Sequence, residues 1–154
     1  MAMVEGPRLH HLAVETADLD NSIGWYTEFF GGSVSWTLAE FSELTRQRLP
    51  GITRLAEVVT GPCRFHLFTR HADYARPAAD MLQFQHVCIG CDSAQELAAW
   101  RRRWQELYAT GRYAFVRPEP PTEIVVDADQ VSSFYAYDVN GLEFEFTHDP
   151  GEVR

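Results

Sequence analysis

Four polar side chains occupy strand-like segments whose other residues are mostly apolar. They are His11 in "RLHHLAVE" (8–15), His66 in "CRFHLFTR" (63–70), His86 in "LQFQHVCIGC" (82–91) and Glu145 in "LEFEFTHD" (142–149). Because alternate residues of a strand face opposite sides of a sheet, each polar side chain lies opposite its apolar neighbours. Three neutral imidazoles and one carboxylate suit a borderline divalent ion, namely Fe, Ni, Co, Zn or Mn. Singly, each residue could equally be an ordinary hydrogen-bonded side chain.

The elements that must position these residues occur twice along the chain. Module 1 (8–70) and module 2 (83–149), joined by a linker (71–82), each predict the order strand, helix and three strands. The helices are expected at 16–32, which Gly31–Gly32 ends, and at 93–111, which begins with a Ser93–Glu96 capping box. The remaining strands are expected at 33–41, 53–60, 122–128 and 132–139, with an Asn140–Gly141 turn before the last strand.

The repeat places the four polar residues at matching positions. His11 aligns with His86, and His66 aligns with Glu145, each pair about half the chain apart. We therefore expect an α+β fold in which two tandem βαβββ modules form one domain over residues 1–154. Their curved mixed sheets would form a cavity that gathers the four residues around one point. An ion held there with open positions could polarise a substrate oxygen.

Composition limits the partners. The net charge of −9 argues against a nucleic acid or an anionic membrane surface as partner. We expect no membrane span, because there is no run of 18 apolar residues, and no secretion signal at the N-terminus. Three cysteines do not make a disulfide framework, so we predict a cytoplasmic protein.

Three stretches resemble the vicinal oxygen chelate superfamily, which includes glyoxalase I, methylmalonyl-CoA epimerase, fosfomycin-resistance enzymes, extradiol dioxygenases and bleomycin-binding proteins. The stretches are "HLAVETADLDNSIGWYTEFFG" (11–31), "QHVCIG" (85–90) and "DVNGLEFEF" (138–146). The likeness covers residues 8–148. It implies a glyoxalase-like fold, a small-molecule substrate and a homodimer. It also leaves open whether the site forms within one chain or across a dimer.

The resemblance implies the same ligands as the repeat. His11 and His86 match the first-strand ligands of the two modules, and Glu145 matches the final carboxylate. His66 stands where glyoxalase I has a glutamate and the epimerase a glutamine, which weakens the transfer of either chemistry. The bleomycin-binding branch usually lacks the ligand set, so its presence favours catalysis.

Further residues are candidates for the chemistry. Glu143 shares the face of Glu145 and is the preferred base, ahead of Glu57 and Glu123, although each of the three could instead be a solvated strand carboxylate. For substrate contacts we predict Trp36, Arg48, Phe68 and Tyr137, from an aromatic set that also holds Phe134 and Tyr135 and from three arginines at 46, 48 and 54. Sheet packing and an ordinary surface loop are the alternatives.

The C-x-x-C formed by Cys88 and Cys91 invites a redox or zinc interpretation. The two positions are three apart in a predicted strand, so their side chains face opposite sides of the sheet, and the helix that would lower a thiolate pKa begins after both. We interpret the motif as coincidental.

The sequence thus predicts a divalent-metal enzyme that acts on a small oxygenated substrate by chelation and proton transfer. Isomerase, epimerase, lyase or cyclase chemistry fits, and a dioxygenase fits less well because His66 leaves fewer open positions on the ion. The alternative is a metal-free protein that sequesters an aromatic antibiotic in the same cavity.

Overall fold

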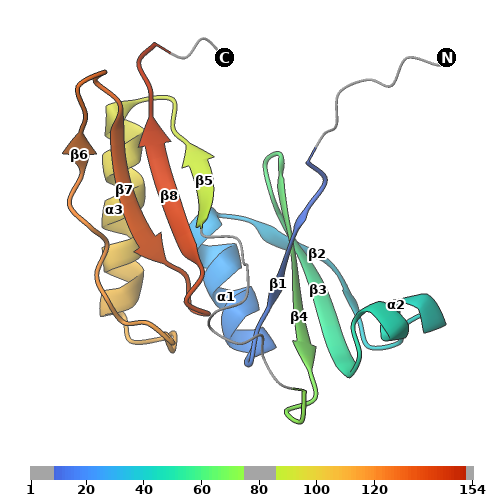
Figure 1. The fold of residues 1–154 in the computed structure, drawn as a ribbon. Coiled ribbons are helices and arrows are strands. Elements are labelled where there is room, and N and C mark those ends of the chain that lie inside the picture. The colour runs from blue at the N-terminus through green and yellow to red at the C-terminus, as the bar shows by residue number, and fades with distance from the viewer. Residues whose placement is uncertain (1–8, 75–85, 152–154) are drawn as a thin grey trace, which may run out of the picture. The chain divides into compact units, whose positions relative to one another are not determined.

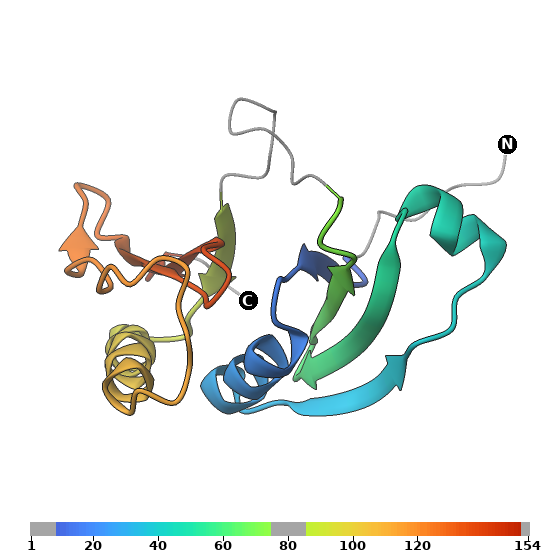
Figure 2. The same ribbon diagram turned by 90° about the horizontal axis from the view of Figure 1, so that it is seen from below.

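The computed structural model describes residues 9–74 and 86–151, and it divides the chain into two compact units, Met1–Tyr74 and Ala75–Arg154 (Figure 1). Each unit is a four-stranded mixed sheet with a long helix against one face (Figure 2). The units are described separately below.

The first unit has strand order β1-β4-β3-β2. The parallel pair is β1 with β4, and the other pairs are antiparallel. Its elements are β1 (Leu12–Glu15), α1 (Leu19–Phe30), β2 (Ser33–Leu38), α2 (Glu43–Arg48), β3 (Ile52–Thr60) and β4 (Cys63–Arg70).

The second unit has the corresponding order β5-β8-β7-β6, again with its first and last strands parallel. Its elements are β5 (His86–Gly90), α3 (Ala94–Ala109), β6 (Val125–Val126), β7 (Ser132–Tyr137) and β8 (Glu143–His148). The α+β class and the repeated βαβββ order predicted from the sequence are confirmed.

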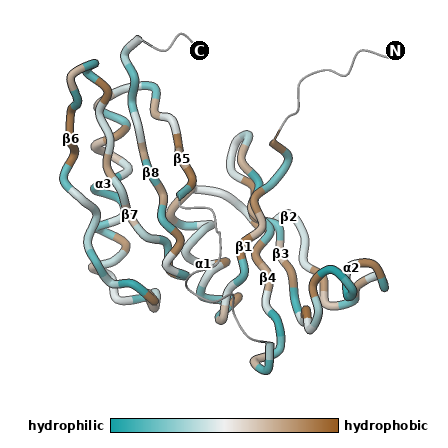
Figure 3. Tube along the Cα trace, viewed as in Figure 1, coloured by the Kyte–Doolittle hydropathy of each residue, from teal (hydrophilic) through white to brown (hydrophobic). Residues whose placement is uncertain are grey.

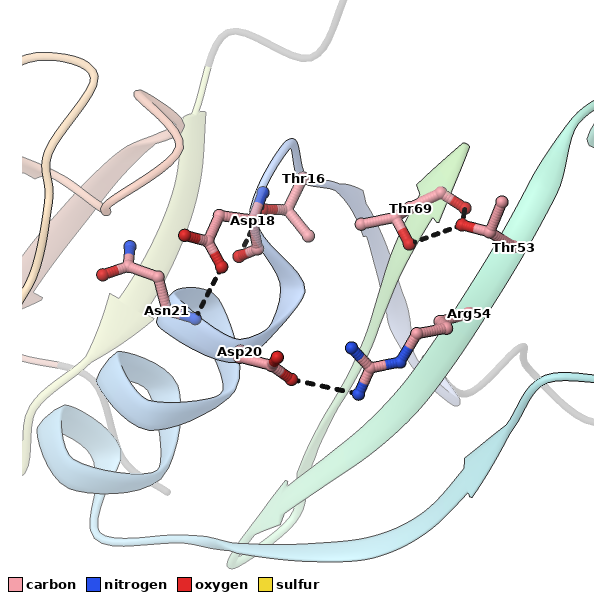
Figure 4. Close-up of polar contacts among 7 residues, drawn as sticks. All are labelled: Thr16, Asp18, Asp20, Asn21, Thr53, Arg54 and Thr69. Carbon is pink, nitrogen blue, oxygen red and sulfur yellow. Dashed lines mark hydrogen bonds and ion pairs between the residues drawn. The ribbon is translucent and has the colours of Figure 1, made fainter. Parts of the chain in front are cut away.

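The ends of α1 follow from local side-chain chemistry. Asp18 precedes the helix in extended conformation, and its carboxylate accepts a hydrogen bond from the Asn21 backbone N–H (Figure 4). Gly31 ends the helix at φ 65°, a left-handed conformation that glycine adopts without steric cost. In α3, Ser93 accepts from the backbone N–H of Glu96, and the Glu96 carboxylate accepts from that of Asp92.

The core of each unit lies between its helix and the facing side of its sheet. Alternation along β4 places Phe65 and Leu67 against α1. There the ring of Phe65 packs edge-on against that of Tyr26, with 4.9 Å between the ring centroids. In the second unit, Phe146 of β8 stacks on Phe134 at 4.8 Å, and both are fully buried. Figure 3 shows the matching alternation of apolar and polar residues along β8. The opposite side of each sheet, here called the open face, carries polar side chains.

Some predicted boundaries were wrong. Helix α2 lies where a loop was expected, and only Val125 and Val126 of the predicted strand 122–128 pair with β7. The opening strand begins at Leu12, so His11 lies one residue before it. Residues 82–85 of the predicted fifth strand and most of the linker 71–82 lie outside the described residues.

Candidate functional site

The two sheets hold their key polar residues in the same register. Ala13 of β1 pairs with His66 of β4, and Cys88 of β5 pairs with Glu145 of β8. His11 lies two residues before Ala13, the partner of His66, and His86 lies two residues before Cys88, the partner of Glu145. Because residues two apart in a strand share a face, His11 lies on the same side of its sheet as His66, and His86 on the same side as Glu145. The repeat inferred from sequence is thus also a repeat of side-chain placement within each unit.

In the first unit the two predicted histidines are in direct contact. The rings of His11 and His66 stack at 3.7 Å between centroids with an interplanar angle of 12°. Burial, together with the neighbouring His66 and His10, lowers the pKa of His11 below 6.5. This imidazole is therefore neutral at pH 7, the form in which histidine binds metal ions. Trp36 lies edge-on to His66 at 5.0 Å, on the same open face.

Glu57 of β3 completes this cluster and corrects its interpretation as a solvated carboxylate. The residue is only 2% exposed. One carboxylate oxygen accepts from Arg64 at 3.1 Å, and the other lies 2.9 Å from Nε2 of His66. The Glu57 pKa is lowered, first by the hydrogen bond with His66 and then by a hydrogen bond with Ser35 and by the positive charge of Arg64. The sequence signal was a single glutamate within the apolar run "LAEVV" (55–59).

In the second unit, His86 and Glu145 are also in direct contact. Nε2 of His86 lies 3.1 Å from Oε2 of Glu145, and the phenol of Tyr135 donates to Oε1 at 2.9 Å. Tyr135 pairs with Glu145 in register, as Glu57 pairs with His66. The hydrogen bond to Glu145 and burial raise the Tyr135 pKa, so the phenol is protonated at neutral pH. Nδ1 of His86 is buried and meets no partner among the described residues.

A hollow of about 420 Å³ lies beside this pair on the open face of the second sheet. We call it the β6–β8 hollow. It is lined by hydroxyls, two carboxylates and two valines: Thr122, Val125, Asp127, Val131, Ser133, Tyr135, Glu145 and Thr147. Its volume is within the range of small-molecule sites.

The predicted base Glu143 lies next along the open face. It pairs in register with His86 on one side and with Tyr137 on the other. Burial, followed by the charge of Glu143, raises the Tyr137 pKa. The guanidinium of Arg117 lies 3.8 Å above the Tyr137 ring and is paired with Glu119.

The other predicted contacts are distributed over the first unit. Phe68 is buried on the open side of β4, paired with Glu15 and Leu55, and Arg48 is exposed at the end of α2. Arg54 was one of three arginines considered for substrate contacts, but its side chain points to α1 and pairs with Asp20 at 3.0 Å (Figure 4).

Burial bears on two further sequence interpretations. Phe134 was a candidate wall of the site, but it is 0% exposed in the core against α3. Cys88 is exposed and Cys91 is 2% exposed, and no disulfide joins the two. The C-x-x-C thus has one exposed and one buried thiol, and its interpretation as coincidental stays a prediction.

The donor atoms fit a divalent ion in chemistry. Two donors that share one ion at about 2.1 Å lie about 3 Å apart, which is the separation of the His86 and Glu145 atoms. Over residues 9–74 and 86–151, no group of three or more histidine, cysteine, aspartate or glutamate side chains is gathered as a complete metal site. Each unit supplies two of the four predicted ligands, so the full set remains a proposal. None of the described helices is long and apolar enough to cross a membrane.

Comparison with known proteins relates the whole chain to one family. Residues 8–146 match the model of the glyoxalase/bleomycin resistance protein/dioxygenase superfamily. No curated protein matches the chain.

Several solved structures have the same fold. A lactoylglutathione lyase from Agrobacterium tumefaciens is 19% identical over 93% of this chain and 94% of that one, with a TM-score of 0.61. A glyoxalase family protein from Bacillus cereus is 17% identical over 98% and 99%, with a TM-score of 0.66. The fosfomycin resistance protein FosX from Listeria monocytogenes, complexed with Mn(II) and sulfate, is 14% identical over 95% and 93%, with a TM-score of 0.57.

Proposed function

The chain belongs to the glyoxalase/bleomycin resistance protein/dioxygenase superfamily, and from that premise we propose that it is a divalent-metal-dependent enzyme that moves a proton on a small oxygenated substrate. The observation that carries the proposal is the repeated register, which brings His11 to His66 and His86 to Glu145. Isomerase, epimerase, lyase and cyclase reactions that proceed through an enolate begin with such a proton transfer.

The proposed ligands are His11, His66, His86 and Glu145, contributed by one chain or by two chains of a dimer. A bound ion of the Fe, Ni, Co, Zn or Mn group would supply a Lewis acid that stabilises negative charge on a substrate oxygen. FosX, which shares the fold, is known with Mn(II). That the enzyme is a homodimer in the cytoplasm stays a prediction from the sequence.

The second unit supplies the groups for proton transfer. Glu143, two residues from Glu145 on the same side of β8, would accept a proton from a substrate carbon next to a carbonyl. The C–H electron pair then moves toward the carbonyl oxygen, and the proton returns from the carboxyl group to a carbon of the product. Tyr135 holds Glu145 by donating to Oε1, and Glu145 is the alternative base.

The lining of the β6–β8 hollow favours an uncharged, hydroxyl-bearing substrate. Thr122, Ser133 and Thr147 present hydroxyls, whereas the two ionisable groups apart from Tyr135 are the carboxylates of Asp127 and Glu145. None of the residues described as its lining is basic, and Asp127, which is not a proposed ligand, would repel a phosphate or carboxylate substrate even when an ion offsets the charge of Glu145. We propose a small polyol with a carbonyl group as the substrate class.

Metal analysis of protein purified without a histidine tag tests the proposal. We expect a first-row divalent ion in the wild type and its loss in Glu145→Ala and His86→Ala. Glu123→Ala is the matched control, because Glu123 is 87% exposed and is paired with Arg101, which is not a proposed ligand. Glu143→Gln should retain the ion and lose turnover. A folded wild type that takes up no ion, and that binds an aromatic antibiotic instead, would establish the alternative function.

A further inference from the structure

Glu57 is a buried carboxylate to which the proposed function gives no role. It lies on β3, next to His66 on one side and Trp36 on the other, and faces the open side of the first sheet. Burial of a carboxylate is unfavourable unless hydrogen bonds and opposite charge compensate it. Here Arg64 and His66 supply that compensation at 3.1 and 2.9 Å.

Arg64 alone would be sufficient to neutralise Glu57, so the contact with His66 calls for its own explanation. Arg64 has a side chain 44% exposed, whereas the side chain of His66 is 15% exposed. The ring of His66 is also stacked on His11 and edge-on to Trp36. Glu57 therefore completes a set of contacts that fix both the plane and the rotation of one imidazole.

The contact also determines which nitrogen carries the proton. An ionised carboxylate can only accept hydrogen bonds, and Glu57 is paired through its other oxygen with the guanidinium of Arg64 at 3.1 Å. Nε2 of a neutral His66 must therefore be the N–H that donates to Glu57. The lone pair of the ring is then on Nδ1, and a hydrogen bond of this kind orients metal-binding histidines in general.

We propose that Glu57 is a positioning residue that holds His66 in the Nε2-protonated tautomer and so presents Nδ1 as its metal-binding atom. This inference rests on the proposed function, because it assigns an atom to one of the proposed ligands. It goes further in predicting that the first unit is prepared for the ion before the ion binds.

The tautomer can be measured in the metal-free protein by long-range ¹H–¹⁵N NMR on ¹⁵N-labelled histidine, with the His66 signals assigned from a His66→Asn variant. The wild type should show the Nε2–H tautomer at pH 7. Glu57→Gln, whose amide can donate as well as accept, and Glu57→Ala should both release the ring to a mixture of tautomers. Glu123→Gln, an exposed carboxylate of the second unit, should leave His66 unchanged.

Zn(II) affinity, measured by competition with a chelator, gives the second readout. Both Glu57 variants should bind Zn(II) about 10–100-fold more weakly than the wild type while retaining a dispersed amide spectrum. An Nδ1–H tautomer in the wild type, or an unchanged tautomer and affinity in Glu57→Gln, overturns the role of Glu57. A wild type that binds no Zn(II) overturns the proposed function and the ligand role of His66 with it, whatever tautomer the ring has.

Discussion

The two units share a topology and a register but differ in the chemistry of their open faces. In the first unit a histidine on the last strand contacts a buried carboxylate, Glu57, on the neighbouring strand. In the second unit the last strand carries the carboxylate, Glu145, and the neighbouring strand carries the phenol of Tyr135. A single repeated backbone thus supports a closed, ionic cluster in one unit and an accessible cluster beside a hollow in the other.

Under the proposed function, the difference would correspond to a division of tasks. In the first unit, Glu57 is 2% exposed and its contact constrains the ring of His66, as expected for a cluster that fixes the orientation of a metal ligand. The side chain of His86 is 31% exposed, and its partner Glu145 lines the β6–β8 hollow, as expected for a part that meets a substrate. The helix-facing sides of both sheets remain apolar and alike.

The largest expected effects on the free energy of unfolding come from substitutions on the helix-facing sides of the two sheets, which are alike. Phe65 and Phe144 are each 1% exposed, and each pairs with the first strand of its unit. Phe65→Ala and Phe144→Ala should each reduce the free energy of unfolding by about 3–5 kcal/mol, because each leaves a core cavity. Urea denaturation measures both, and a loss below about 1 kcal/mol in only one of them would show that the two cores are not equivalent.

The matched positions on the open faces should differ. Glu57→Ala leaves the N–H of His66 without its acceptor and should reduce the free energy of unfolding by about 1–3 kcal/mol. Tyr135→Phe removes one hydrogen bond from a half-buried pair and should reduce it by about 0.5–1.5 kcal/mol. Denaturation of the metal-free protein compares the two variants. A larger loss in Tyr135→Phe would reverse the assignment of the closed cluster to the first unit.

The β6–β8 hollow should discriminate by ligand charge. D-xylulose, a neutral ketose, should bind at least about tenfold more tightly than its 5-phosphate, because Asp127, which is not a proposed ligand, repels the phosphate. Asp127→Asn removes the negative charge and should therefore reduce the ratio of the two affinities. The turn should be retained, because the amide oxygen can still accept hydrogen bonds from the backbone N–H groups of Asp129 and Val131. NMR titration measures both affinities, and equal or tighter binding of the phosphate would contradict the proposed substrate class.

The smallest effect is expected outside both clusters. Asp20→Asn removes the exposed ion pair with Arg54 and should change the free energy of unfolding by less than about 1 kcal/mol. It should leave the metal content unchanged, because Arg54 points to α1 and not to the open face. Loss of the ion in this variant would show that Arg54 or Asp20 contributes to the metal site.

The strands, and the side of the sheet on which the four candidate ligands lie, were predictable because that information is local. Alternating apolar residues along "RFHLF" (64–68) and "EFEF" (143–146) determine which side chains face the helix, and the caps at Asp18 and Ser93 mark helix starts. Helix α2 was missed because it is six residues long and buries none of them, so it has no apolar periodicity.

Glu57 was misjudged for a different reason. A glutamate among apolar strand residues is usually solvated, and its burial here depends on two side chains of the neighbouring strand β4. Tyr135 similarly gains its role from Glu145, its partner across β7 and β8. Such cross-strand partners depend on register, which the sequence pattern of one strand does not contain.

The central claim is that both clusters serve the same ion, and native mass spectrometry of untagged protein tests it most directly. The wild type should carry one divalent ion per chain, and His66→Ala in the first unit and Glu145→Ala in the second should each remove it. His71→Ala, at an exposed histidine outside both clusters, should retain it. An ion that persists in His66→Ala but disappears in Glu145→Ala, or two ions per chain, would contradict the account.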